Sequence, residues 1–195
     1  MKYLRRGIWY LASRLLLICI ILALMIVVFY YAMNVTNIQI ILKDGMAARA
    51  KYVMGIDSNL SELDKYFSSQ YIRQTVEPKQ DKSDQDPDKN EQADPVRLAY
   101  KGESPYADYT IRGIDHRLDV DFFWVWPWED ENIVITIHEK IPRIDGRVKG
   151  TIASEVIREK GSEAVYPPAW EEAAYRVTMK KDGTQWKISR MELMK

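Results

Sequence analysis

Cysteine and histidine are nearly absent from this sequence, and several common site motifs are missing. The single cysteine, Cys19, excludes an intrachain disulfide, so a folded region must be stabilised by its hydrophobic core. The two histidines, His116 and His138, fit no H-x-x-x-H, C-x-x-C or H-E-x-x-H spacing, which argues against a metal site. A glycine-rich phosphate loop and a G-x-S-x-G nucleophile motif are also missing. We therefore predict a protein without metal, cofactor or catalytic activity.

A surplus of either charge is missing as well. The chain has 28 basic and 28 acidic residues, which gives a formal net charge of zero. Proteins that bind nucleic acid need a basic face to neutralise the phosphates. Nucleic acid is therefore not among the partners that we expect.

What the sequence does contain is one long apolar run. Residues 15–33, LLLICIILALMIVVFYYAM, include no charge, glycine, proline or side-chain amide. A helix of that length spans the roughly 30 Å hydrocarbon core of a bilayer. We predict a tail at 1–14, a transmembrane helix at 15–33 and a folded domain at 34–195. The alternatives are a cleaved signal peptide, whose apolar region is usually shorter and ends in small residues, and the core helix of a soluble protein.

The residues that flank this run predict its orientation. The tail carries basic but no acidic residues, and basic residues next to a span are retained in the cytoplasm. We therefore expect a cytoplasmic N-terminus, a domain outside the cytoplasm and a location in the cell membrane. Aromatic residues flank both ends, as is typical of the lipid–water interface. The basic residues are Lys2, Arg5, Arg6 and Arg14, and the aromatic residues are Trp9, Tyr10, Tyr30 and Tyr31.

Two helices are predicted after the span. The first continues to about Met54 with an apolar stripe at spacings of three and four, and Arg49 falls among the polar residues between the stripe positions. The second runs from Leu60 to about Arg73, with Asn59 as its N-cap. The apolar stripe of the first helix comprises Val35, Ile38, Ile41, Leu42, Met46, Ala50 and Val53.

An acidic segment with almost no apolar residue follows at 77–95, EPKQDKSDQDPDKNEQADP. Such a composition buries too little surface to offset the entropy of ordering. We expect a disordered loop there. A solvated spacer is the usual role of such a loop, and a docking segment for a basic partner is the alternative.

Alternating apolar residues predict strands from Tyr106 onward. The pattern is clearest at 133–137, and a parity slip near Gly113 indicates a bulge. Residues 181–183 (KDG) predict a tight turn before the last strand, whereas 143–160 fit either a strand pair or a short helix. The expected fold class is α+β: the transmembrane helix, then two helices packed on a curved, mostly antiparallel sheet of four to five strands.

The order of elements and the closing stretch Asp182–Ile188 (DGTQWKI) resemble the nuclear-transport-factor-two-like (cystatin-like) superfamily. Its members often end in a G-x-x-W-K-I hairpin, which implies that Trp186 and Ile188 pack into a cone. The layout also resembles inner-membrane assembly components of type IV secretion and conjugation machines. It is similar, too, to single-pass proteins of spore-forming bacteria, which share the stretches at 45–50 and 126–129. None of these resemblances implies an activity for particular residues of this chain.

Aromatic residues form the strongest local anomaly. Four of them share one parity, so an extended chain places their rings on one side, and Pro127 favours a strand end. One interpretation is a platform for a sugar ring, a partner protein or lipid headgroups. The other is that the rings fill the concave sheet as core residues. The four residues are Phe122, Trp124, Trp126 and Trp128, and Trp170 after Pro167-Pro168 is a further candidate for the interaction surface.

Acidic residues on one predicted strand provide a candidate pocket. Asp115 and Asp119 share a parity, and two close carboxylates facing a cone could act as acid and base. His116 has the opposite parity and is a candidate cone-lining base. The alternative is that the two aspartates lie on a solvated face, because Leu118 and Val120 already supply the buried one.

These patterns lead to one functional hypothesis and two rivals. We expect a membrane-anchored extracytoplasmic interaction or scaffold domain that docks other envelope proteins, with self-association as one form of that role. The first rival is a ligand-binding or catalytic cone that uses Asp115, Asp119 or His116. The second is contact with lipid or cell wall through Trp126 and Trp128.

Overall fold

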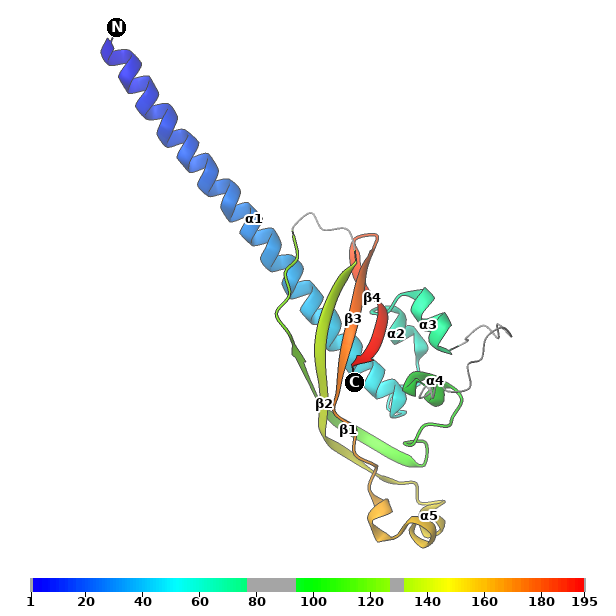
Figure 1. Ribbon diagram of the computed structural model, residues 1–195. Helices are drawn as coiled ribbons and strands as arrows, with labels where there is room; N and C mark the ends of the chain where they lie inside the picture. The colour runs from blue at the N-terminus through cyan, green and yellow to red at the C-terminus, as the bar shows by residue number, and fades with distance from the viewer. Residues whose placement is uncertain (1, 77–93, 127–131, 195) are drawn as a thin grey trace. The chain divides into compact units, whose positions relative to one another are not determined.

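The computed structural model describes residues 2–76, 94–126 and 132–194. Its fold is α+β, as the sequence predicts: one long apolar helix, several short helices and a four-stranded antiparallel sheet that does not close (Figure 1). The chain divides into two compact units. One contains Met1–Ile38 with Trp124–Glu129, and the other contains Gln39–Phe123 with Asp130–Lys195. Most of the predicted loop at 77–95, and Trp128, lie outside the described residues.

Helix α1 (Lys2–Val53) is continuous through both the predicted span and the predicted helix after it. From Leu15 to Tyr30 every side chain is exposed, whereas from Ile38 onward one face is buried. The buried positions follow the predicted spacing of three and four, which is the period of a helix with one apolar face. Gly55, with a φ of +70°, follows the end of the helix. The buried stripe comprises Ile38, Leu42, Met46, Ala50 and Val53.

Four strands form the sheet in the order β1–β2–β3–β4, each antiparallel to the next. They are β1 (Tyr109–Val120), β2 (Ile133–Val148), β3 (Ala173–Asp182) and β4 (Gln185–Met194). The predicted turn joins β3 to β4, and Gly183 there has the positive φ of +64° that favours glycine.

Two register shifts interrupt the pairing of β1 with β2. The first lies between Ile111 and Gly113, where the sequence predicts a bulge. The second lies between Asp115 and Arg117, which pair with Arg143 and Lys140 respectively. One residue of β1, His116, is therefore opposite two residues of β2, Ile141 and Pro142. Proline has no N–H to donate, so a bulge is a tolerated place for it within a sheet.

The short helices differ in part from the prediction. Instead of one helix from Leu60 to Arg73, the chain forms α2 (Leu60–Asp64) and α3 (Ser69–Val76). Between them the backbone pairs with β4: Ser68 N donates to Ile188 O at 2.8 Å, and Ile188 N donates to Tyr66 O at 2.8 Å. These long-range hydrogen bonds replace helical ones and break the helix. The N-cap prediction is confirmed, because Asn59 Oδ1 accepts from Ser61 N at 3.0 Å.

The structure also shows which elements form at the end of the predicted loop and at 143–160. Asp94 caps α4 (Pro95–Tyr100) by accepting from Val96 N at 2.8 Å, so the last two residues of the predicted loop begin a helix. Of the alternatives for 143–160, the short helix forms, but in place of a strand pair the segment begins with the end of one strand. Strand β2 runs to Val148, and α5 (Ala153–Lys160) follows, with a 3₁₀ turn at Ser162–Val165.

The core of the larger unit lies between the sheet and the helices. Gly45 of α1 allows close approach: a Cβ there would lie 2.9 Å from Tyr66 Cβ and 3.3 Å from Ile188 Cδ1. Trp186 and Ile188 are buried. Aliphatic residues of β2 and β3 fill the same face, namely Ile135, Ile137, Val177 and Met179.

Candidate functional site

Three ionisable or polar side chains meet inside the larger unit, each from a different element. Arg49 comes from α1, His116 from β1 and Glu139 from β2. Their side chains are 3%, 6% and 0% exposed, respectively. Charged residues are almost never buried to this extent unless they are paired. We call these three residues the buried polar cluster.

Glu139 joins the other two members of this cluster. Its Oε1 lies 3.0 Å from His116 Nε2, which is a hydrogen bond when that nitrogen carries the proton. Its Oε2 lies 3.6 Å from Arg49 Nη1, close enough for an ion pair but too far for a hydrogen bond. A strand-to-strand contact and a helix-to-sheet contact therefore depend on one carboxylate.

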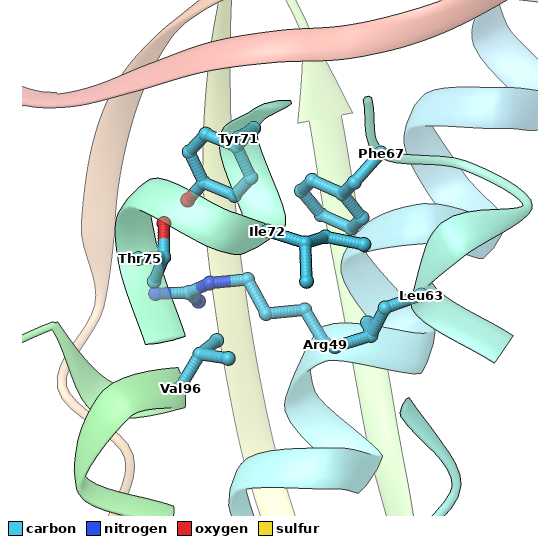
Figure 2. A pocket seen from close by; sticks show the side chains of 7 residues that line it. All are labelled: Arg49, Leu63, Phe67, Tyr71, Ile72, Thr75 and Val96. Carbon is cyan, nitrogen blue, oxygen red and sulfur yellow. The ribbon is translucent and has the colours of Figure 1, made fainter. Parts of the chain in front are cut away.

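Aromatic residues also lie near Arg49. Its guanidinium carbon lies 5.4 Å from the centre of the Tyr175 ring. Figure 2 shows the side chain extending from α1 until its guanidinium lies beside Thr75, with Tyr71 on the other side of Thr75. Burial and a nearby acidic charge, Asp94, raise the pKa of Tyr71 to about 12, so this phenol stays neutral. Burial lowers the pKa of Arg49, but the charge of Glu139 offsets this, and the pKa ends above its ordinary value.

A small cavity adjoins Arg49, lined otherwise by residues of α2, α3 and α4 and by Phe67 between α2 and α3 (Figure 2). Its volume is about 10 Å³, which corresponds to one water molecule. Arg49 Nε and Nη1 and Glu139 Oε2 have no hydrogen-bond partner among the described residues. A larger hollow of about 430 Å³ lies elsewhere, at Tyr109, Tyr166 and Pro167, and is widely open to solvent.

The buried polar cluster has the composition of an acid–base site, but its side chains are at most 6% exposed. His116 and Glu139 do not line either hollow. A general base must come within hydrogen-bond reach of its substrate, directly or through one water. The cluster links α1, β1 and β2 through electrostatic contacts. Forming it requires the desolvation of these groups, which costs free energy.

The three predicted pocket residues do not come together. Asp115 and Asp119 are exposed and alternate with the inward residues of β1. Asp115 forms a surface ion pair with Arg117, with Oδ2 and Nη2 2.7 Å apart. Of the three, only His116 points into the core. Successive side chains of a strand point to opposite faces of the sheet, so the neighbours of an exposed residue face inward. The alternative that places the aspartates on a solvated face describes what is seen.

Two members of the cluster escaped the sequence analysis, although both follow a visible pattern. Arg49 lies three residues after Met46 and four before Val53, which places it on the buried stripe of the helix. Glu139 continues the alternation of 133–137 and precedes the buried Ile141. In both cases the charge of the residue suggests an exposed position, whereas its spacing in the sequence indicates a buried one.

The predicted aromatic surface is only partly brought together. Trp124 stacks on Tyr31 of α1, with ring centres 4.5 Å apart and planes at 29°, and Trp126 meets Trp124 edge-on at 5.5 Å. Trp170 belongs to the other unit, where it stacks on Tyr106 at 6.1 Å. The sequence pattern could not indicate the Tyr31 contact, because it joins residues far apart in the chain.

Within the parts of the chain that the structure describes, no group of three or more His, Cys, Asp or Glu residues is arranged to hold a metal ion. Comparison with family models, with curated proteins and with solved structures finds no match to this chain. The resemblance to the nuclear-transport-factor-two-like superfamily stays a prediction. The function therefore has to be inferred from the residues of the chain itself.

Proposed function

We propose that this protein is a single-pass membrane-anchored domain that lies outside the cytoplasm and docks other proteins of the cell envelope, without catalysing a reaction. The observation that carries the proposal is the first half of α1. It is long and apolar enough to cross a membrane, and the segment from Leu15 to Tyr30 has every side chain exposed.

The energetics of that segment support an anchor. Leaving one large aliphatic or aromatic side chain in water instead of burying it costs roughly 1.5–3 kcal/mol. More than a dozen such side chains are exposed here in succession, including Leu16, Leu24 and Phe29. The hydrocarbon core of a bilayer removes that cost, and a helix satisfies its own backbone polar groups there.

Helix continuity supports an anchor that is retained. Helix α1 runs without a break from the apolar segment to the buried positions Leu42, Met46 and Val53. A signal peptidase that cut after the apolar run would sever a helix that the folded domain uses in its core. The basic residues before the run, Arg5, Arg6 and Arg14, favour a cytoplasmic N-terminus.

The packing of the domain supports docking over ligand binding. Small-molecule pockets usually enclose roughly 300–1,000 Å³. Here Trp186, Ile188 and the aliphatic residues of β2 and β3 fill the inner face of the sheet, and the cavity beside Arg49 has room for one water molecule. The hollow of about 430 Å³ at Tyr109 and Tyr166 reaches that volume, but it is open to solvent and does not enclose a ligand. The outer face of the sheet is open: Val134, His138 and Arg176 are exposed on it.

The orientation is tested with single cysteines, since the chain has only Cys19. In a Cys19→Ala background, Ser154→Cys provides an exposed thiol on α5. We expect a membrane-impermeant maleimide to label it in intact cells once any outer barrier is opened. Labelling that requires rupture of the cell membrane would contradict the proposed orientation.

Docking is tested by site-specific photo-crosslinking in native membranes. A photoreactive residue replaces Arg176 at the centre of the outer sheet face, and the matched control carries it at Ser154 on α5, which is also exposed. We expect discrete crosslinked protein bands from position 176 that are absent from position 154. The same pattern from both positions, or no crosslinked band from any outer-face position, would count against a docking face.

A catalytic cone is the second candidate, because His116 and Glu139 form a buried acid–base pair. It predicts that a substrate-sized opening forms at these residues. Solvent exchange of the His116 ring nitrogen protons, followed by NMR, distinguishes the two. Rapid exchange would favour a cone that opens, and slow exchange would favour a closed core.

A further inference from the structure

The aromatic segment Trp124–Trp126 lies in the same compact unit as the apolar half of α1. Its contact with the helix is specific: Trp124 stacks face to face on Tyr31, and Trp126 adds an edge-on contact to Trp124. Val125, between the two tryptophans, is buried. The backbone of the segment is therefore held by packing on both sides of the chain, although it forms no helix or strand.

Tyr31 gives this contact a defined depth. Sixteen residues separate it from Leu15, the start of the apolar run, which corresponds to about 24 Å of helix. If α1 crosses a bilayer with a hydrocarbon core of about 30 Å, Tyr31 lies close to the end of that core. A ring stacked on Tyr31 must lie at the same depth.

The rings also have the chemistry of that region. Tryptophan combines a large apolar surface with one N–H donor, and it is enriched where the acyl chains meet the headgroups. Trp124 and Trp126 are 53% and 47% exposed, so about half of each ring is left for contact with lipid. Two adjacent half-exposed indole rings in the same unit as a transmembrane segment form a continuous apolar surface with that segment.

We infer that Trp124 and Trp126, together with Tyr31, form a second membrane contact that sits in the headgroup–acyl boundary of the bilayer that α1 crosses. The occupant of this aromatic surface is the lipid of that bilayer. This inference rests on the proposed membrane anchor. It adds to the anchor a contact contributed by a segment more than ninety residues further along the chain.

Depth-dependent fluorescence quenching tests the inference in the full-length protein reconstituted into phosphatidylcholine vesicles. One vesicle set carries bromine near the headgroup end of the acyl chains, and the other carries it near the terminal methyl groups. A Trp9→Phe background removes the tryptophan at the opposite end of the apolar run. We expect the shallow bromines to quench more tryptophan emission than the deep ones.

The variants assign that quenching to particular rings. Trp124→Phe with Trp126→Phe keeps aromatic packing on Tyr31 but removes the indoles, and we expect loss of most of the shallow quenching. Trp126→Phe alone should cause a smaller loss. The matched control, Trp170→Phe, removes a half-buried tryptophan of the other unit and should leave the quenching unchanged.

Two outcomes overturn the inference, and a third overturns the anchor itself. Equal shallow quenching with and without Trp124 and Trp126, or stronger quenching by deep than by shallow bromines, would place these rings outside the headgroup boundary. Failure of the reconstituted protein to float with vesicles after an alkaline wash would instead refute the proposed anchor. The two failures are therefore distinguishable in one preparation.

Discussion

The two halves of α1 are one continuous helix, but they differ in the exposure of their apolar side chains. Between Leu15 and Tyr30 the helix is apolar on all sides, and its side chains are exposed. After Ile38 it is amphipathic, with apolar and small residues buried and Lys43, Asp44 and Lys51 exposed. Helix propensity cannot cause this difference, because both halves form a helix. We propose that the surroundings differ: lipid surrounds the first half, whereas the folded domain and water surround the second.

This comparison shows why exposure alone is a poor measure of environment. Leu22 and Ile40 are 49% and 52% exposed, respectively, so their solvent accessibility does not distinguish them. In our account Leu22 contacts lipid and Ile40 contacts water. The predictions below follow from that difference, from the largest expected effect to the smallest.

The largest effect is expected from charges in the first half. Replacing Leu22 and Met25 by Asp should remove the protein from the membrane fraction, because each charge at the centre of a span costs about 3 kcal/mol. Alkaline extraction followed by immunoblotting measures the retained fraction. The matched control, Ile40→Asp, alters an equally exposed residue of the second half and should leave retention unchanged. Equal behaviour of both variants would abolish the distinction between the halves.

In the second half, Arg49 forms a buried ion pair with Glu139. Glu139→Ala leaves this cation buried without its counter-charge, and we expect a loss of about 3–5 kcal/mol in the free energy of unfolding. Replacing Arg49 and Glu139 together by Met should recover most of the loss. Denaturant unfolding of the full-length protein in detergent measures both.

An exposed ion pair provides the control for that prediction. Asp115→Ala breaks a surface contact with Arg117 and should change the free energy of unfolding by less than about 1 kcal/mol. A comparable loss in Glu139→Ala and Asp115→Ala would show that the cluster does not stabilise the fold through buried charge.

Close approach of the second half to its neighbours is tested at Gly45. Alanine would gain about 1 kcal/mol of helix propensity, but its Cβ would lie 2.9 Å from Tyr66 Cβ. We expect the clash to dominate, with a net loss of about 1–3 kcal/mol. In Gly113→Ala the new methyl group meets nothing within 4 Å, so that variant serves as the control. Thermal melts in which Gly45→Ala is the more stable variant would disprove this packing.

The smallest effect concerns alkaline pH. Burial raises the folded-state pKa of Tyr71 to about 12, above its ordinary value near 10. The stability that this phenol contributes is complete below about pH 10 and is lost as the pH rises toward about 12. By about pH 11 the loss is about 1.4 kcal/mol. Tyr71→Phe should show a shallower decline of stability over this range, and an identical decline would exclude a role for Tyr71.

Local patterns were sufficient to predict much of the fold. The stripe from Ile38 to Val53, the bulge near Gly113 and the turn at 181–183 all depend on neighbouring residues and are confirmed. The predicted helix at 60–73 is wrong as one element because Ile188, far along the chain, accepts and donates hydrogen bonds in its middle. A long-range contact of this kind leaves no trace in local periodicity.

The candidate site was predicted less well, for a different reason. Arg49 and Glu139 occupy buried positions by spacing, but a charged side chain usually indicates an exposed position, because its desolvation is costly. An ion pair between the two side chains offsets the cost of desolvation. This pair can be recognised only once the positions of α1, β1 and β2 in the fold are known. His116 shows the same limit: its parity indicates the core, but its partner cannot be read from the strand that carries it.

Labelling of the native Cys19 tests the central claim most directly. This thiol is exposed in the structure and lies within the apolar half of α1, and it is the only cysteine in the chain. In native membranes, we predict that a water-soluble maleimide leaves Cys19 unmodified until detergent is added. A thiol placed at Ile40 in a Cys19→Ala background should react at once. Immediate modification of Cys19 in intact membranes would contradict a helix embedded in lipid.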